Sequence, residues 1–273
     1  MIAPRAALFL PASNPRALAK ARTLDCDMLI LDLEDAVPDT DKDAARAAAI
    51  AAVTEGFGEK LVAIRLNGSG TAWHQADVAA LAVSAAALVV IPKVEDAGTI
   101  AGIAAALGKS VYAMIETPAG LLAATTIAAA DGVAGLIAGT NDLAHELRLP
   151  AAVGRTGLAL ALQTIVLAAR AAGIVALDGV WNKLDDIAGL EAECAEGRAF
   201  GFDGKTLIHP NQIAAANAAF APTEAEIEEA RALLEAATGG AQRFRGRMVE
   251  AMHVASARAI LARVAGKLRE RPL

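Results

Sequence analysis

Short hydrophobic runs recur along the chain, and longer alanine-rich stretches with apolar residues at helical spacing lie between them. The short runs are continuously apolar, which is typical of parallel strands buried on both faces. Eight strands are expected, at Ala6–Leu10, Met28–Leu33, Leu61–Arg65, Leu88–Ile91, Val111–Ile115, Gly135–Ala138, Val175–Asp178 and Gly204–Ile208. Helices are expected at roughly 14–25, 40–56, 73–84, 95–107, 118–129, 155–172 and 184–200.

This alternation predicts an α/β fold, namely a (β/α)8 TIM barrel. The alternative is an open doubly wound sheet, in which functional residues gather mainly at one switch point. Polar residues instead follow many of the strands, which favours the barrel. The barrel is expected to form a catalytic domain over residues 1–220.

Residues 221–273 exceed what a barrel needs and predict a C-terminal helical extension. Thr223 is placed to cap one helix, which Gly239-Gly240 would end. An arginine-rich turn, Gln242–Arg247, then precedes a second helical pattern at Met248–Val264. Such an appendage is expected to cover the barrel mouth of its own subunit or of a neighbour, as a lid.

Composition narrows the function classes. The net charge of -6 leaves no basic field for a phosphate backbone, which excludes a nucleic-acid partner. No stretch approaches the roughly 20 apolar residues of a membrane span, so we expect no membrane partner. Cys26 and Cys194 have no disulfide or metal-site spacing, which favours buried, reduced thiols and a cytoplasmic location.

Two carboxylates follow neighbouring strands. Glu116 comes directly after the fifth predicted strand, and Asp142 lies in the loop after the sixth. Two protein oxygens leave coordination positions for water and substrate, which is how Mg²⁺ is usually held. Each residue has a plainer interpretation, because Glu116 suits a helix N-terminus and Asp142 suits an N-cap. Together they predict a metal site, and Glu116 would also contact the substrate.

Three further residues at strand ends are expected to bind substrate. Arg65 ends the third strand, and its fork of donors matches a carboxylate or a developing oxyanion. An ion pair with Glu34 or Asp35 is its structural alternative. Asn67 follows Arg65 in a loop loosened by glycine, and Lys93 directly follows the fourth strand.

The second strand ends in an acidic sequence, Asp32-Leu33-Glu34-Asp35. Asp32 is expected to tie polar layers of the barrel, whereas Glu34 and Asp35 are candidate catalytic groups that reach metal-bound water. Lys42 and Arg46 lie four residues apart on the next helix and suit a solvated face as well as a phosphate contact. The four histidines, His74, His145, His209 and His253, lack metal-site spacing and are treated as structural or peripheral.

A series of short motifs runs nearly end to end: Leu8–Pro11, Leu31–Val37, Lys42 with Arg46, Arg65–Asn67, Pro92–Lys93, Ile115–Pro118, Gly139–Leu143, Gly201–Lys205 and Ile208–Pro210. Each is weak alone, but their order and spacing resemble the citrate lyase β-subunit-like (CitE-like) branch of the HpcH/HpaI aldolase superfamily. The resemblance implies a barrel that forms homotrimers or hexamers built from two trimers. It also implies that Glu116 and Asp142 hold Mg²⁺, with Mn²⁺ as an alternative ion, and that Arg65 binds the substrate.

By the same resemblance, the reaction is cleavage or formation of a β-hydroxyacyl thioester such as malyl-, citramalyl- or citryl-CoA. The products of cleavage would be a 2-oxo acid and an acetyl thioester, so CoA would enter as part of the substrate. Its phosphates could meet Arg16, Lys20, Lys93 or the arginines of residues 243–247. The acid or base that protonates the enolate carbon is, in the family, an aspartate of a C-terminal Gly-Lys-Met-Val-Asp segment.

This chain departs from the family at that segment, which reads Gly246-Arg247-Met248-Val249-Glu250. Glu250 is the candidate replacement, although its side chain reaches one methylene further. An ordinary surface glutamate is the plainer interpretation, and His253 is another candidate for proton transfer.

Two alternatives stay open. A CoA-free aldolase acting on 4-hydroxy-2-oxo acids would share the metal pair, but those relatives use an early histidine, and here no histidine precedes His74. A lyase subunit of a larger complex would instead receive its thioester from an acyl-carrier protein.

Overall fold

The computed structural model describes residues 3–264. The chain forms two compact units, and the division between them falls between Ala219 and Phe220. The first unit comprises residues 4–219 and contains all the strand-end residues discussed above. No helix within residues 3–264 is both long and apolar enough to cross a membrane.

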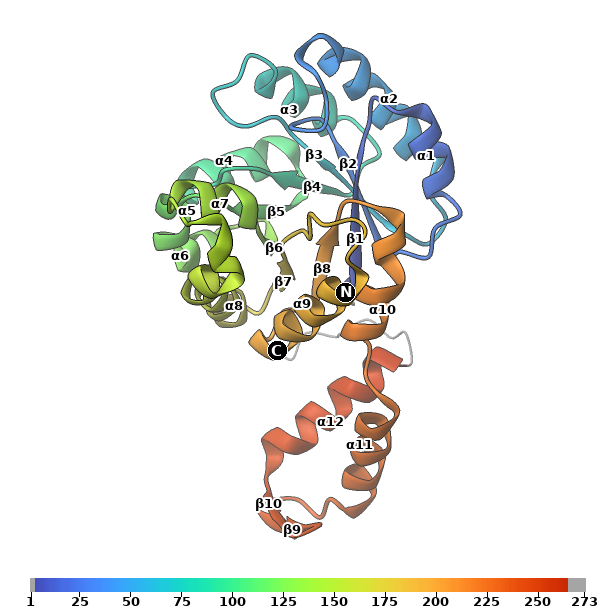
Figure 1. The fold of residues 1–273 in the computed structure, drawn as a ribbon, viewed down its shortest axis with the longest axis vertical. Coiled ribbons are helices and arrows are strands. Elements are labelled where there is room, and N and C mark those ends of the chain that lie inside the picture. The colour runs from blue at the N-terminus through green and yellow to red at the C-terminus, as the bar shows by residue number, and fades with distance from the viewer. Residues whose placement is uncertain (1–2, 265–273) are drawn as a thin grey trace. The chain divides into compact units, whose positions relative to one another are not determined.

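The first unit is a closed barrel of eight parallel strands in chain order, in which β1 also pairs with β8 (Figure 1). This confirms the predicted fold, and each strand overlaps its predicted range. The strands are β1 (Ala6–Pro11), β2 (Met28–Asp32), β3 (Leu61–Arg65), β4 (Leu88–Ile91), β5 (Ser110–Ile115), β6 (Val133–Ala138), β7 (Val175–Asp178) and β8 (Gly204–Leu207).

Helices surround the strands (Figure 1). They are α1 (Pro15–Ala21), α2 (Lys42–Glu55), α3 (His74–Ala82), α4 (Ala97–Leu107), α5 (Pro118–Leu122), α6 (Ala124–Ala128), α7 (Thr140–Glu146), α8 (Ala159–Ala172), α9 (Ile187–Phe200) and α10 (Ile213–Phe220). Short 3-10 turns occur at Asp39–Asp41, Ala151–Leu158 and Pro210–Gln212. The helix expected over 118–129 is broken at Ala123, and α7 was not expected at all.

The interior of the barrel is closely packed. Its buried side chains are Ala7, Met28, Ile30, Ala63, Leu88, Val90, Tyr112, Met114, Ile137 and Leu177. The ring of Tyr112 occupies the space beside Gly135, where a Cβ would lie 2.8 Å from a ring carbon. Polar groups therefore gather beyond this core, at the C-terminal ends of the strands, where barrel enzymes carry their active sites.

The second unit contains α11 (Glu224–Ala236), a hairpin of β9 (Gln242–Phe244) and β10 (Arg247–Val249), and α12 (Ala251–Val264). Thr223 caps α11 as predicted, with Glu226 completing a capping box. The expected arginine-rich turn is a hairpin, so the helix predicted from Met248 begins only at Ala251. The core of this unit is formed by Ala230, Leu233, Phe244, Val249 and Ala257. The last nine residues of the predicted extension lie outside the described range.

Candidate active site

A cavity of about 320 Å³ opens at the C-terminal ends of the barrel strands. Its lining residues are Phe9, Asp32, Asp35, Ala36, Arg65, Met114, Glu116, Ala138, Gly139, Thr140, Asn141, Asp142, Val180, Thr206 and Ile208. Acidic groups and one arginine therefore share the cavity with an apolar group of side chains. The structure brings together four of the predicted site residues in the lining: Asp35, Arg65, Glu116 and Asp142.

Glu116 follows β5 and is only 3% exposed. Its Oε1 accepts a 2.7 Å hydrogen bond from the backbone N–H of Lys93, which fixes the carboxylate against the loop after β4. The neighbouring loop leaves room for it, because residue 139 is glycine. Burial raises the pKa of Glu116, and the Asp142 carboxylate raises it further, against the opposing effect of the Lys93 hydrogen bond. A cation beside the pair would favour the ionised form.

Asp142 lies in the first turn of α7, directly beyond β6. Its side chain is 40% exposed, and its Oδ2 is 3.6 Å from the Lys93 ammonium. It makes no side-chain cap hydrogen bond at the start of α7, so the N-cap interpretation does not describe it. The carboxylate is therefore presented to the cavity.

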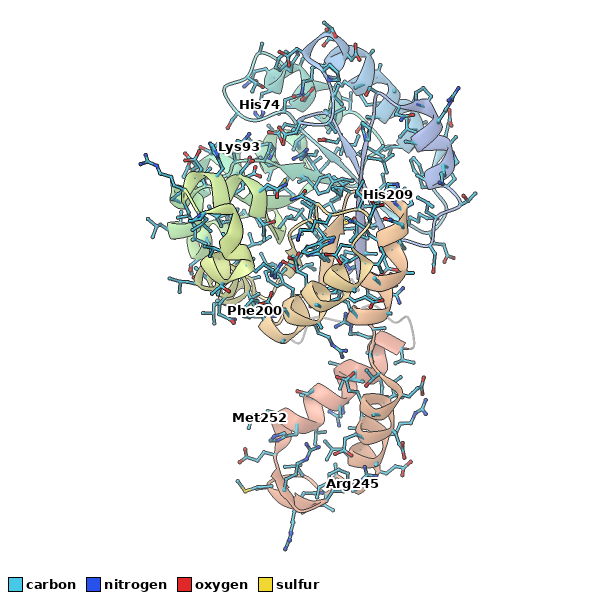
Figure 2. The ribbon with its side chains drawn as sticks, viewed as in Figure 1. His74, Lys93, Phe200, His209, Arg245 and Met252 are labelled. Atoms are coloured by element: carbon cyan, nitrogen blue, oxygen red, sulfur yellow. The ribbon has the colours of Figure 1, made fainter. Side chains whose placement is uncertain are left out.

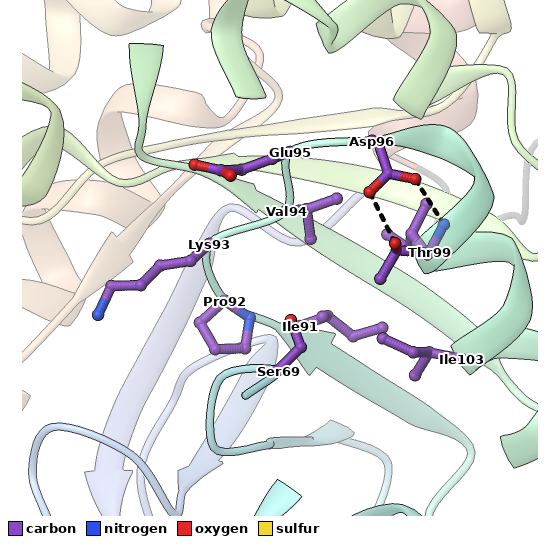
Figure 3. Close-up of a pocket in the computed structure, with 10 residues that line it drawn as sticks. Ser69, Ile91, Pro92, Lys93, Val94, Glu95, Asp96, Thr99 and Ile103 are labelled. Carbon is purple, nitrogen blue, oxygen red and sulfur yellow. Dashed lines mark hydrogen bonds between the residues drawn. The ribbon is translucent and has the colours of Figure 1, made fainter. Parts of the chain in front are cut away.

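Lys93 connects these acidic groups. Its backbone has a positive φ of 50°, an uncommon conformation for a residue other than glycine. This conformation accompanies the N–H donation to Glu116, while the ammonium lies 3.5 Å from Glu34 Oε1. A smaller cavity of about 110 Å³ adjoins the same loop, and Figure 3 shows the Lys93 side chain extending away from the apolar side chain of Ile103.

Arg65 is held mainly by Asp32. Its Nε and Nη2 each donate to one oxygen of Asp32 at 2.6 Å, and its guanidinium lies 4.9 Å from the ring centre of Phe9. Burial disfavours the charge on Arg65, but Asp32 outweighs this and raises its pKa. Asp32 thus does more than tie barrel layers. The third nitrogen, Arg65 Nη1, lies 2.9 Å from Glu34 Oε2 and 3.5 Å from Asp35 Oδ2. The ion pairs expected as the structural alternative to substrate binding are therefore also present.

Glu34 is 7% exposed and sits between Arg65 and Lys93. Its Oε2 is close to Arg65 Nη1 but outside hydrogen-bond geometry. Burial raises the pKa of Glu34 to about 7, with Arg65 opposing and the nearby Asp35 and Glu116 carboxylates adding to the rise. A carboxyl with such a pKa can exchange a proton near neutral pH.

Lys42 and Arg46 do not form a solvated face, which corrects that interpretation. Lys42 is 5% exposed, and its ammonium donates to the backbone carbonyls of Leu33 and Glu34 at 2.9 and 2.7 Å. Arg46 donates to the buried Asp77 at 2.6 Å. Helical spacing alone could not show which face of α2 is buried. Lys42 therefore anchors the loop that carries the acidic residues after β2.

Asn67 is committed to hydrogen bonds within the protein. Its backbone N–H and side-chain amide both donate to Asp77, and its carbonyl lies 2.9 Å from His74 Nδ1. It is 2% exposed and is not part of the cavity lining. Its geometry is that of a residue that holds the loop after β3, and the substrate contact predicted for it stays a prediction.

Glu250 belongs to the second unit, just before α12. Its backbone N–H donates to His253 Nδ1 at 3.0 Å, so that nitrogen caps the helix start. Met252, labelled in Figure 2, lies two residues after Glu250, in the first turn of α12, and is 63% exposed. The proton-transfer roles predicted for Glu250 and His253 stay predictions.

Several cavity residues were not anticipated from the sequence. The lining includes the largely apolar side chains of Phe9, Met114, Val180 and Ile208 and the hydroxyl group of Thr206. The sequence signal that could have identified them is their position at or near the C-terminal ends of β1, β5, β7 and β8.

A buried ionic network was also missed. Lys205 and Asp178 are both fully buried and pair at 3.0 Å, and Arg155 joins Asp178 at 3.0 Å. Glu193 accepts from Lys205 at 2.6 Å. This network joins β7, β8 and α9 to the segment after α7, which supports the region that carries Asp142.

The residues fit a hard divalent cation. Glu116 keeps one carboxylate oxygen outside its hydrogen bond with Lys93, and Asp142 is presented from the next strand end. Carboxylate oxygens are the ligands that Mg²⁺ prefers, and it retains several waters when two of them bind it. Within residues 3–264, no group of three or more His, Cys, Asp and Glu side chains forms a metal site. The site thus offers two carboxylates rather than a full protein cage.

The fold and the site define a class: a (β/α)8-barrel enzyme with two carboxylates at the strand ends that fit a divalent cation. Residues 5–210 match the HpcH/HpaI aldolase/citrate lyase family. The chain belongs to this family, which confirms the predicted resemblance.

Relatives match nearly the full length. A (3S)-malyl-CoA thioesterase of Cereibacter sphaeroides is 42% identical over 267 residues, which cover 95% of this chain and 94% of that protein. A citrate lyase subunit beta-like protein of Mycobacterium tuberculosis is 36% identical and covers 94% of both chains. The crystal structure of protein CitE from that organism, in complex with magnesium, acetoacetate and coenzyme A, has a TM-score of 0.83 and 35% identity. It covers 96% of this chain and 98% of that one.

Proposed function

We propose that this chain is an Mg²⁺-dependent carbon–carbon lyase that cleaves or forms a short β-hydroxyacyl-CoA thioester. The observation that carries the proposal is the placement of Glu116, Asp142 and Arg65 around one cavity of about 320 Å³. The magnesium and coenzyme A bound by the CitE relative support the same chemistry. Cleavage would yield a 2-oxo acid and acetyl-CoA.

Glu116 and Asp142 would hold the ion, which supplies Lewis acidity to the substrate carboxylate and hydroxyl oxygens when bound. Arg65 has one nitrogen, Nη1, that is not committed to Asp32, and this nitrogen would orient the same oxygens. Glu34, with a pKa of about 7, would accept the proton that leaves the hydroxyl group. Asp35 would order water at the open side of the cavity.

Protonation of the acetyl carbon needs a further group. Glu250 is the candidate, supplied by the second unit of the same or a neighbouring subunit in a homotrimer or hexamer. Its role is tested by Glu250→Gln, which should slow exchange of the acetyl methyl protons while it leaves Mg²⁺ affinity unchanged. The reaction is assigned to the cytoplasm, in keeping with two buried free cysteines.

The direct test is an assay of malyl-, citramalyl- and citryl-CoA with Mg²⁺, in which all products are identified. The proposal requires a 2-oxo acid and acetyl-CoA in equal amounts, with no turnover after chelation of the metal. Turnover of free 4-hydroxy-2-oxo acids instead would favour a CoA-free aldolase. Turnover only with a thioester on an acyl-carrier protein would favour a subunit of a larger complex.

A second candidate is hydrolysis of the thioester in the same substrate. The observation in its favour is the 42% identity to a (3S)-malyl-CoA thioesterase. Both reactions need the hydroxy acid held in the same cavity, but hydrolysis requires water to attack the thioester carbonyl. Release of CoA and malate from malyl-CoA, without glyoxylate, would favour hydrolysis.

A further inference from the structure

Lys93 contacts carboxylates that come from three different strand ends. Its ammonium is 3.5 Å from Glu34 Oε1, beyond β2, and 3.6 Å from Asp142 Oδ2, beyond β6. The backbone N–H of the same residue is bonded to Glu116, beyond β5. Lys93 itself follows β4, so one residue touches both proposed metal ligands and the buried Glu34.

The charges around the cavity explain why a cation is held there. Asp35, Glu116 and Asp142 line the cavity, and Glu34 adjoins it. Arg65 is largely neutralised by its two-bond contact with Asp32. Among the ion pairs of the described residues, Lys93 alone pairs with both Glu34 and Asp142, whereas Arg65 pairs with Glu34 but not with Asp142. The ammonium and a divalent ion would therefore compete for the Asp142 carboxylate.

The geometry also allows the ammonium to leave. The hydrogen bond from the Lys93 ammonium to Glu34 is long, at 3.5 Å, the contact with Asp142 is 3.6 Å, and the side chain is 47% exposed. The backbone is anchored separately by the bond to Glu116. The side chain can consequently move without disturbing the hydrogen bond that positions Glu116.

We propose that Lys93 is an internal counter-ion of the carboxylates around the proposed metal site, and that a binding divalent cation displaces its ammonium toward the anionic substrate. This inference rests on the proposed metal site. Metal and substrate binding are then coupled, with the metal favouring the substrate and the substrate favouring the metal by the same factor. The preferred order is metal first, because Lys93 becomes available to a substrate carboxylate only after it leaves Glu34 and Asp142.

The test uses Lys93→Met, which keeps the length of the stem and the backbone N–H but removes the charge. Calorimetric titration of the metal-free protein with Mn²⁺ should show binding about tenfold tighter than in the wild type, since the ammonium no longer competes for Asp142. Lys93→Arg should stay close to wild type. Lys183→Met is the matched control, because Lys183 is an exposed lysine that contacts the Trp181 ring rather than the acidic residues.

A second titration measures the coupling with pyruvate as the probe 2-oxo acid. In the wild type, saturating Mg²⁺ should tighten pyruvate binding, and Lys93→Met should reduce that enhancement about fivefold. Equal Mn²⁺ affinity in the wild type and Lys93→Met, or an equal gain in Lys183→Met, would overturn this inference alone. A wild-type protein that binds no Mn²⁺ would overturn both the inference and the proposed metal site.

Discussion

The side chain of Glu116 occupies the space that any side chain at Gly139 would need. A Cβ atom on residue 139 would lie 2.2 Å from Glu116 Cβ and 2.5 Å from its Oε2. Neither distance is compatible with two non-bonded heavy atoms. The loop after β6 therefore requires glycine in order to keep the carboxylate of the β5 strand end in the cavity.

Gly139→Ala should displace Glu116 and weaken divalent-metal binding by about tenfold or more, as expected when a metal ligand loses its support. Calorimetric titration with Mn²⁺ measures the change. Gly102→Ala is the control, because a Cβ at that position in α4 meets nothing within 4 Å. It should leave metal affinity unchanged and raise stability slightly. Unchanged metal affinity in Gly139→Ala would contradict the steric account.

The second prediction concerns the fork between Arg65 and Asp32. Lysine cannot make both 2.6 Å contacts, so Arg65→Lys should leave the fully buried Asp32 incompletely paired. We expect the free energy of unfolding to fall by about 1–3 kcal/mol and kcat/KM to fall at least about a hundredfold. Denaturant unfolding and steady-state kinetics measure the two effects. Arg22→Lys, at a surface pair with the exposed Glu55, should cost much less. Equal losses of unfolding free energy in Arg65→Lys and Arg22→Lys would contradict a stabilising role for the buried two-bond contact between Arg65 and Asp32.

The third prediction is a pH dependence that arises from Glu34. Burial raises its pKa from 4.5 to about 7 in the folded chain, so the folded state binds the proton more tightly than the unfolded state. Stability from this group is present below pH 4.5 and is lost as the pH rises through 7. Glutamine has no carboxyl group to ionise, so Glu34→Gln should not lose this stability as the pH rises.

The comparison is made on metal-free protein at pH 4 and pH 8. At each pH, the free energy of unfolding of Glu34→Gln is compared with that of the wild type. The difference should shift in favour of Glu34→Gln between pH 4 and pH 8, by at most about 3 kcal/mol. Thermal or denaturant unfolding at both pH values gives the difference. A stability difference that does not vary with pH would exclude the raised pKa.

The sequence was sufficient to predict the barrel, because parallel strands buried on both faces must be continuously apolar. The eight strands follow from that pattern, as do the residues that end them. Glu116 and Asp142 could be paired before the structure was known, since consecutive strands of a barrel are neighbours. That inference needs only chain order.

The partners of individual side chains could not be predicted in this way. The fork of Arg65 meets Asp32 rather than Glu34 or Asp35 alone, because the register places Arg65 opposite Asp32 on adjacent strands. Lys42 is buried against two carbonyl groups, although its spacing from Arg46 suited an exposed face. Asn67 is held by Asp77, a residue that lies ten positions further along the chain.

Two features of the backbone conformation could not be predicted from the sequence either, one at Lys93 and one in the hairpin of the second unit. Lys93 has a positive φ, which few residues other than glycine adopt and which no local motif signalled. In the second unit, residues 247–249 pair with residues 242–244 and delay the start of α12. Arg245 and Gly246, both with positive φ, form the turn of that hairpin.

The most direct test of the account is the Mg²⁺ affinity of Glu116→Gln, measured by calorimetry on protein whose folding is checked by thermal melting. Glutamine keeps the size of the side chain and an oxygen to accept the Lys93 N–H, but it removes the charge. Glu95→Gln, an exposed change in the loop after β4, is the control. The account predicts that Glu116→Gln loses Mg²⁺ binding by at least about a hundredfold while it remains folded, and that Glu95→Gln binds like the wild type. Wild-type Mg²⁺ affinity in Glu116→Gln would contradict it.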